Sequence, residues 1–240
     1  DKSEKIIFIW TEWILPDVSQ KNLIQYKWLF DDHFNENHLL IIGINSQSNK
    51  NEIKKYFNSI SVYDNQLNLL NSYNKVNLVP FGEFLPFENI LKRIGLRSIA
   101  NNYQSFSSGN QRNIIEIENK KFSLKILPLI CYEIIYSGKL FKDPNFDLIV
   151  NISEDGWFGQ SIGPKQHFEH SIFRAIESGK YIVRSANNGS AAIINPLGII
   201  EQRVEFNRSG YVDLKENRKM QPTIFSLHGN KIFGLLILLY

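Results

Sequence analysis

Leu127-Pro-Leu-Ile-Cys-Tyr-Glu133 takes an apolar run, typical of a buried strand, directly into a helical pattern. Cys131, the only cysteine of the chain, stands at this change. A nucleophile at a strand-to-helix turn has an exposed thiol and nearby backbone N–H groups that can hold an oxyanion. A buried structural cysteine is the alternative, since free cysteine is among the most buried residue types.

The flanking sequence predicts an alternation of strands and helices. Apolar, β-branched runs predict strands at 6–10, 39–44, 59–63, 122–129, 148–152, 182–185 and 191–195. Helical spacing of apolar residues predicts helices at 19–34, 133–141 and 163–178. We interpret the polar segment 45–52 as a loop and Asn195-Pro-Leu-Gly198 as a tight turn between strands. Together these elements predict an α/β fold.

Composition excludes several classes of protein. The 240 residues are 43% hydrophobic, which is enough to bury a sizeable core. The net charge is only +3, and no basic stripe with interleaved aromatic residues indicates a nucleic-acid partner. One cysteine excludes an internal disulfide framework and a four-cysteine zinc site.

The last residues suggest a second, short segment after the main domain. We predict one catalytic domain over 1–219 and an extension over 220–240. Residues 232–240 carry no charge, but a spanning helix needs roughly 20 apolar residues. The run is therefore either a core helix or strand, or the start of a truncated transmembrane helix, and we favour the second interpretation.

Three separated residues form a coherent chemical set. Glu12 follows the first predicted strand, and Lys75 precedes an apolar segment that contains Glu83. Each has an ordinary alternative, a solvated strand end for Glu12 and a surface cation for Lys75. Taken with Cys131, the carboxylate can accept the thiol proton, the ammonium can stabilise an oxyanion, and the thiolate can attack a carbonyl.

Several motifs occur with these residues in a fixed order. They are Leu78-Val-Pro-Phe-Gly-Glu-Phe-Leu-Pro86, Trp157-Phe-Gly-Gln-Ser-Ile-Gly-Pro-Lys-Gln-His167, Arg174-Ala-Ile-Glu-Ser-Gly179, Arg184-Ser-Ala-Asn-Asn-Gly189 and Asn195-Pro-Leu-Gly198. With these motifs in this order, the chain resembles the nitrilase (carbon–nitrogen hydrolase) superfamily, and more narrowly the catalytic domain of the apolipoprotein N-acyltransferase family. The resemblance extends from about Phe8 to the C-terminus.

The resemblance implies a role for each matching residue. Glu12 matches the family's base, Lys75 its catalytic lysine and Cys131 its nucleophile. The implied substrate-binding residues are Glu83, Tyr132, Glu133, Trp157 and Phe158. Two departures stand out: Trp10-Thr-Glu12 replaces Trp-Pro-Glu, and Glu154-Asp155 replaces Asn-Asp, which adds a charge near the pocket.

The resemblance also implies a fold, a reaction and a location. The expected fold is the nitrilase-type α-β-β-α sandwich, here without its first strand and helix. The expected reaction needs no cofactor and moves an acyl chain from a phospholipid, through a cysteine thioester, to a diacylglyceryl-cysteine lipoprotein. The expected location is the bacterial inner membrane, with the catalytic domain facing the periplasm. Membrane attachment is expected through segments that are missing here. We expect little activity from this chain alone.

Two other functions stay open at this point. One is a soluble amidase or nitrilase that uses the same three residues on a small C–N substrate. The other is an inactive fragment of a split acyltransferase gene. A metal centre is not expected, because His167 and His170 lack the HExxH spacing and a third ligand.

Overall fold

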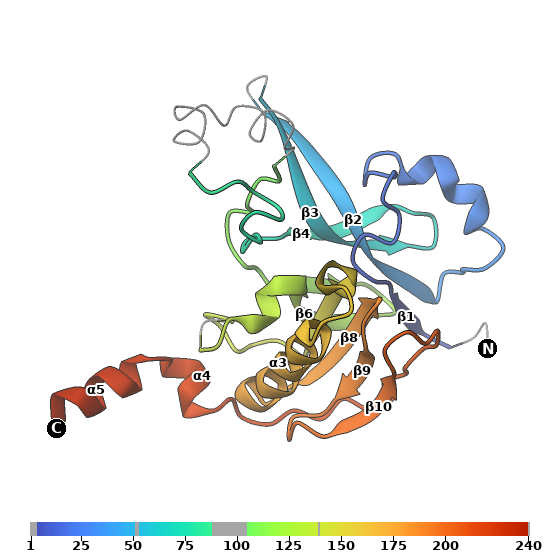
Figure 1. The fold of residues 1–240 in the computed structure, drawn as a ribbon. Helices are drawn as coiled ribbons and strands as arrows, with labels where there is room; N and C mark the ends of the chain where they lie inside the picture. The colour runs from blue at the N-terminus through green and yellow to red at the C-terminus, as the bar shows by residue number, and fades with distance from the viewer. Residues whose placement is uncertain (1–3, 51–52, 88–104, 139, 240) are drawn as a thin grey trace.

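Two β-sheets packed face to face form the body of the protein in the computed structural model (Figure 1). The structure describes residues 4–50, 53–87, 105–138 and 140–239. The four-stranded sheet has the order β1-β2-β3-β4. Its strands are β1 (Ile6–Ile9), β2 (His38–Lys50), β3 (Ile53–Asp64) and β4 (Leu69–Asn74). β1 pairs parallel to β2 at one edge, and the other neighbours are antiparallel.

The second sheet has six strands in the order β10-β9-β8-β7-β6-β5. They are β5 (Ile115–Glu118), β6 (Ser123–Ile130), β7 (Leu148–Glu154), β8 (Tyr181–Asn187), β9 (Ala191–Ile194) and β10 (Ile200–Val204). Strands β6, β7 and β8 are parallel. Their carboxyl ends therefore lie at one edge, where Cys131 and Asp155 follow β6 and β7 directly.

Both faces of each sheet are apolar, which explains the nearly continuous apolar runs of the sequence. Along β2, Leu39 and Ile41 point into the core between the sheets, where β7 supplies Val150 and Ile152. Side chains alternate across a strand, so Leu40 and its alternate neighbours pack on the outer face. The inter-sheet core is thus built from alternate residues of long strands, which holds the strand ends in a fixed relation.

Helical segments cover the outer faces. α3 (Gly163–Ser178) packs on the six-stranded sheet through Phe168 and Ala175, and it spans the predicted range (Figure 1). The 3₁₀ helix η1 (Leu23–Leu29) packs through Leu23 on the four-stranded sheet. The layers confirm the nitrilase-type α-β-β-α sandwich.

Two predicted helices are wrong in type and length. Of 19–34, only η1 is helical, because turns follow it and Trp28 projects into solvent with 70% of its surface exposed. Among the described residues of 133–141, only the first turn is helical, in the 3₁₀ helix η2 (Cys131–Ile135), and residue 139 lies outside the described ranges. Both segments reach their apolar partners through short turns, so apolar spacing alone overestimates helix length.

The hairpin between β2 and β3 corrects another prediction. Of the predicted loop 45–52, residues 45–50 instead continue β2, paired with β3 from Asn45 opposite Asn58 onward, and 51–52 lie outside the described residues. The strands β4, β5 and β10 are not predicted from the sequence; they are short or half exposed. The turn Asn195-Pro-Leu-Gly198 is confirmed between β9 and β10, with a positive φ of 80° at Gly198.

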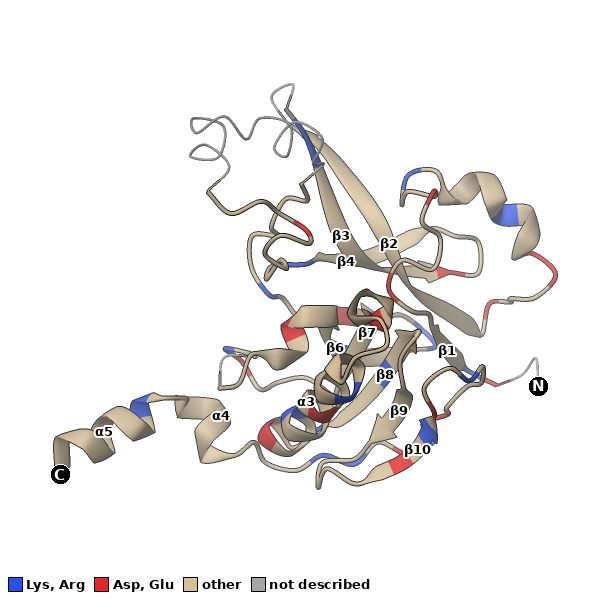
Figure 2. Ribbon diagram, viewed as in Figure 1, with Lys and Arg blue, Asp and Glu red and all other residues tan. Residues whose placement is uncertain are grey.

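The C-terminal residues form two short helices that extend away from the sheets (Figure 1). These are α4 (Ile224–His228) and α5 (Lys231–Leu239). No side chain of α5 is buried, and Figure 2 shows no charge on it beyond its start. Within the described ranges, no helix is long and apolar enough to cross a membrane. α5 is therefore not a core helix, and the division at residue 219 stays a prediction.

Candidate active site

Cys131 lies at the junction of β6 and η2, where the chain turns sharply. Its φ of +46° is in the left-handed region, which is costly for a residue with a Cβ. The residue is buried, with 8% of its surface exposed. The predicted strand-to-helix turn is thus present as a strained turn into a 3₁₀ helix, which directs the thiol toward the end of the four-stranded sheet.

Lys75 follows β4 and is almost completely buried, with 1% of its surface exposed. Its Nζ donates a hydrogen bond to Glu83 Oε1 at 2.9 Å and lies 3.5 Å from Glu12 Oε1. Lys75 also interacts electrostatically with Cys131. The structure therefore brings together the ammonium, both carboxylates and the cysteine that the sequence singled out.

Glu12 is held by groups that the sequence did not indicate. Asn58 Nδ2 donates to Glu12 Oε1 at 2.6 Å and to Glu83 Oε1 at 2.8 Å, so it bridges the two carboxylates. The backbone N–H of Glu154 donates to Glu12 Oε2 at 2.8 Å. Asn58 lies in the middle of β3, where nothing in the local sequence distinguishes it from other polar strand residues.

Neighbouring amide groups donate hydrogen bonds to the Glu154 carboxylate. Its carboxylate accepts hydrogen bonds from the backbone N–H of Gly156 at 2.8 Å and from the Asn188 amide at 3.0 Å. The Asn187 amide also donates to it. The additional carboxylate noted in the sequence is therefore held by hydrogen bonds beside Glu12 rather than directed at Cys131.

Burial and neighbouring charges together shift the pKa values of the Lys75 ammonium and the Cys131 thiol. Burial by itself lowers the pKa of the Lys75 ammonium, but Glu12, Cys131 and Glu83 raise it above its usual value. Burial, reinforced by the negative charge of Glu12, raises the pKa of the Cys131 thiol to about 12, although Lys75 lowers it. At neutral pH the resting pair is an ammonium and a neutral thiol, so attack requires a base to remove the thiol proton.

We expect this raised pKa to appear in the alkylation of Cys131 by iodoacetamide, because the thiolate is the reactive form. From pH 7 to 10 the rate should rise about tenfold per pH unit, without the plateau that a free thiol reaches above its pKa of roughly 8.5. The same shift should make the folded state less stable as pH rises above roughly 8.5, since only the unfolded thiol then ionises. Mass spectrometry of the single cysteine measures the rate, and a plateau near pH 8.5 would contradict the prediction.

Glu133 lies entirely inside the protein, and its carboxylate is surrounded by protein donors. Oε2 accepts from the backbone N–H of Ile130 at 3.0 Å, immediately before Cys131. Oε1 accepts from donors in β4, in the segment after it and in the segment before β5: Tyr73 Oη at 2.6 Å, Val76 N at 3.0 Å, Asn77 N at 3.1 Å and Arg112 Nη2 at 3.4 Å. Glu133 therefore joins the turn that carries Cys131 to the chain that follows Lys75.

The residues matched to substrate binding differ in exposure. Trp157 is 67% exposed, and its ring stacks on Trp13 with centroids 6.4 Å apart. Phe158 is 38% exposed, and Tyr132 is half-buried against Tyr136. We call Trp13, Trp157 and Phe158 the aromatic rim, because Trp13 follows Glu12 and the other two follow Asp155.

His167 does not belong to a two-histidine metal face. Its Nδ1 lies 2.9 Å from Asp155 Oδ1, and its Nε2 lies 3.1 Å from the backbone oxygen of Cys131. Both ring nitrogens therefore face protein oxygen atoms. His170 lies on the same helix and is only partly buried.

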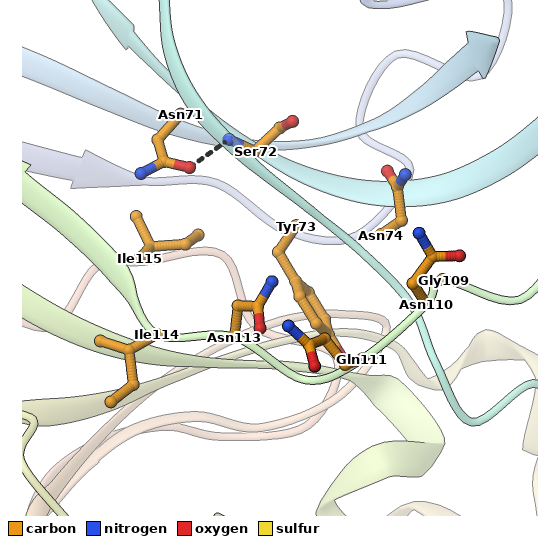
Figure 3. A pocket seen from close by; sticks show the side chains of 10 residues that line it. All are labelled: Asn71, Ser72, Tyr73, Asn74, Gly109, Asn110, Gln111, Asn113, Ile114 and Ile115. Atoms are coloured by element: carbon orange, nitrogen blue, oxygen red, sulfur yellow. Dashed lines mark hydrogen bonds between the residues drawn. The ribbon is translucent and has the colours of Figure 1, made fainter. Parts of the chain in front are cut away.

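A separate polar pocket of about 260 Å³ lies along β4 and the segment before β5 (Figure 3). It is lined by Asn71, Ser72, Tyr73, Asn74, Gly109, Asn110, Gln111, Asn113, Ile114 and Ile115. None of Glu12, Lys75 and Cys131 lines it. Tyr73 contributes to its wall while the Tyr73 hydroxyl binds Glu133, so this side chain stands between the pocket and the Glu133 carboxylate.

Comparison with known families gives one extensive match. The model of the carbon-nitrogen hydrolase family matches residues 26–214. Among solved structures, Nit3 of Saccharomyces cerevisiae, a member of branch 10 of the nitrilase superfamily, superposes with a TM-score of 0.56 at 12% identity. That similarity covers 85% of this chain and 73% of Nit3, and at this identity it supports the fold alone.

Curated relatives have higher identity but are much longer. An apolipoprotein N-acyltransferase of Rhizobium leguminosarum bv. trifolii is 33% identical over 215 residues, covering 88% of this chain and 40% of the relative. One of Rickettsia prowazekii is 35% identical over 237 residues, covering 96% of this chain and 45% of the relative. The chain thus spans less than half the length of these relatives.

Proposed function

The chain belongs to the carbon–nitrogen hydrolase family, and on that premise we propose that it catalyses acyl transfer in lipoprotein maturation. The observation that carries the proposal is the buried ammonium of Lys75, held between two carboxylates and beside the only cysteine. The names of the relatives support N-acylation of an apolipoprotein as the reaction.

In the first half-reaction, Glu12 removes the thiol proton of Cys131 as the sulfur attacks the ester carbonyl carbon of a phospholipid. The ammonium of Lys75 stabilises the tetrahedral oxyanion. The intermediate collapses when the C–O bond breaks, and protonated Glu12 returns its proton to the departing lysophospholipid oxygen. The products are a thioester on Cys131 and a lysophospholipid.

In the second half-reaction, the α-amine of a diacylglyceryl-cysteine attacks the thioester carbonyl carbon. Glu12 takes a proton from the attacking nitrogen, and Lys75 again holds the oxyanion. The C–S bond breaks, the sulfur of Cys131 is reprotonated, and an amide is released. The cycle is a ping-pong exchange that uses only side chains and needs no cofactor.

The partners and the location follow from this proposal. The acyl donor is a phospholipid, and the acceptor is the N-terminus of a diacylglyceryl lipoprotein. Both are lipids, and burying acyl carbons is worth about 0.8 kcal/mol for each CH₂, so they stay in a bilayer. We place the reaction at the bacterial inner membrane, with this domain on the periplasmic side.

An amidase acting on a small C–N substrate is the second candidate, because the solved nitrilase-superfamily structures share the fold. The exposed aromatic rim favours the lipid substrate, because three large exposed aromatic side chains beside the site offer an acyl chain an apolar surface. The two functions are separated by incubating the protein in detergent with a phospholipid and a diacylglyceryl peptide, or with a primary amide. N-acylated peptide supports the transferase, whereas ammonia release alone supports the amidase.

We expect Trp157→Ala to weaken binding of long acyl donors about tenfold, because Trp157 presents an exposed ring beside the site. The KM for a long-chain ester should rise, while the value for a two-carbon ester and the melting temperature stay nearly unchanged. Phe173→Ala is the matched control, since Phe173 is also exposed (55%) but lies well within α3. Equal effects on short and long esters would contradict a role in acyl-chain binding.

A further inference from the structure

Two sequence motifs that the proposed chemistry does not use meet beneath Cys131. One ends at His167, and the other begins at Arg184. Between them lies Asp155, whose Oδ2 accepts from Arg184 Nη2 at 2.7 Å and whose Oδ1 lies 2.9 Å from His167 Nδ1. Ser153 Oγ also donates to Asp155 Oδ1 at 2.6 Å. All four side chains are buried, so they form a closed polar cluster inside the sandwich.

The cluster is packed without spare room. A Cβ added at Gly189 would lie 2.1 Å from Asp155 Oδ2, so only glycine allows the Arg184 segment to approach this closely. Burial by itself raises the pKa of Asp155, but Arg184 and His167 lower it to about 2. Asp155 is therefore a permanent carboxylate that fixes the orientation of the imidazole.

The partner of His167 Nε2 determines its protonation. This nitrogen lies 3.1 Å from the backbone oxygen of Cys131, and a carbonyl oxygen only accepts hydrogen bonds. This contact is a hydrogen bond when Nε2 carries a proton and donates it. Nδ1 lies 2.9 Å from Asp155 Oδ1 and 3.2 Å from Arg184 Nη2, so it can donate to the first or accept from the second. The accepting oxygen belongs to the one residue in η2 that has a positive φ, so the hydrogen bond acts on the strained peptide itself.

We propose that His167 is a positioning residue for Cys131: held by Asp155, it donates Nε2–H to the Cys131 carbonyl and fixes the turn that presents the thiol to Glu12 and Lys75. The inference rests on the proposed function for its catalytic consequence, but the hydrogen bond itself does not depend on that function. A residue in this place orients the nucleophile without contacting the substrate.

A second side chain of α3 supports the same turn. Arg174 follows His167 by seven residues, which is two helical turns, so both project from one face. Arg174 Nη1 donates to the backbone oxygen of Ile135 at 3.2 Å, at the other end of η2. Side chains on one face of α3 thus contact backbone oxygens at both ends of η2.

The test separates the two nitrogen atoms of His167 by substitution. The amide nitrogen of Gln reaches the position of Nε2, so His167→Gln can still donate to the Cys131 carbonyl. The amide of Asn reaches only the position of Nδ1, so His167→Asn keeps the contact with Asp155 and loses the donor to Cys131. His170→Asn on the same helix is the control, and circular dichroism establishes that each variant is folded.

Two probes should change in opposite directions in His167→Asn. Acylation of Cys131 by 4-nitrophenyl butyrate should slow about tenfold to a hundredfold, because the thiol no longer faces Glu12 and Lys75. Alkylation by iodoacetamide at pH 8 should accelerate about tenfold, because the released thiol ionises more readily. His167→Gln should keep both rates within about threefold of the unsubstituted protein, as should the His170 control.

Equal behaviour of the Gln and Asn variants would overturn the inference, because a merely structural histidine has no preference for one nitrogen. If the unsubstituted protein is not acylated at all, the proposed function fails, and the alkylation rates still decide the role of His167. Should both variants unfold, ¹⁵N NMR of histidine-labelled protein decides it without substitution. An unprotonated Nε2 in His167 would refute the hydrogen bond.

Discussion

Cys131→Ala is expected to remove the acyl-enzyme entirely and to lower acyl transfer by about 10³-fold or more, because no other atom in the site can form the thioester. Intact-mass spectrometry after incubation with a phospholipid should show one added acyl chain on the unsubstituted protein and none on the variant. Because the chain has a single cysteine, the adduct has one thiol to occupy. Activity is best compared in a full-length enzyme that contains this sequence.

Cys131→Ser tests the same step with a closer replacement. It should be nearly as damaging, since a hydroxyl is a far weaker acid than a thiol and Glu12 is poorly matched to deprotonate it. The melting temperature of each variant serves as the control for folding. An acylated Cys131→Ala protein would refute the assignment of the nucleophile.

Lys75→Met should have the largest effect on stability, a loss of about 3–5 kcal/mol in the free energy of unfolding. The substitution keeps the length of the side chain but leaves the carboxylates of Glu12 and Glu83 without the cation between them. Acyl transfer should disappear as well, because the oxyanion loses its charged partner. Urea unfolding measures the first effect and the phospholipid assay measures the second.

A triple variant separates the two consequences. Adding Glu12→Gln and Glu83→Gln to Lys75→Met removes the uncompensated charges, so most of the stability should return while activity stays absent. Lys125→Met is the surface control: its exposed ion pair with Glu116 should leave stability nearly unchanged. If Lys75→Met unfolds at the same urea concentration as the unsubstituted protein, the buried ion pair does not stabilise the fold.

The stabilisation by Lys75 has a defined dependence on pH. Its neighbours raise the pKa in the folded state, so the folded protein holds this proton more firmly than the unfolded chain. The contribution is therefore complete below the ordinary lysine pKa of about 10.4 and is lost as pH rises through the folded value. The difference between Lys75→Met and the unsubstituted protein should accordingly be constant from pH 6 to 9.

Motif order was a better guide to the site than local pattern. The cluster of Glu12, Lys75 and Cys131 depends on residues more than fifty positions apart, which no periodicity connects. Their complementary chemistry suggests the set, and the order of the motifs in the resemblance supports it. No role is predicted for Asn58 or Asp155, because a polar residue within or just after a strand has the same local sequence whether or not its side chain binds a buried partner. The catalytic roles of Glu12, Lys75 and Cys131 remain predictions.

For the fold, long apolar runs were more informative than helical spacing. The buried strands β6 to β9 agree with their runs within two residues, because both faces of that sheet demand apolar side chains. The segment 19–34 misleads because tertiary contacts, rather than helix propensity, hold Leu23 and Phe30 against β2. Residues 45–50 form a strand although they are polar. A hairpin that extends beyond the core still pairs the backbone groups of its two strands by hydrogen bonds.

The shared hydrogen bonds of Glu133 have a consequence for the motions of the site. One carboxylate binds the amide before Cys131 and the two amides after Lys75, on opposite sheets. If either strand end opens, the buried Glu133 carboxylate loses hydrogen-bond donors, which is costly inside a protein. We therefore expect Cys131 and Lys75 to belong to one cooperative unit, whose two segments open together rather than one at a time.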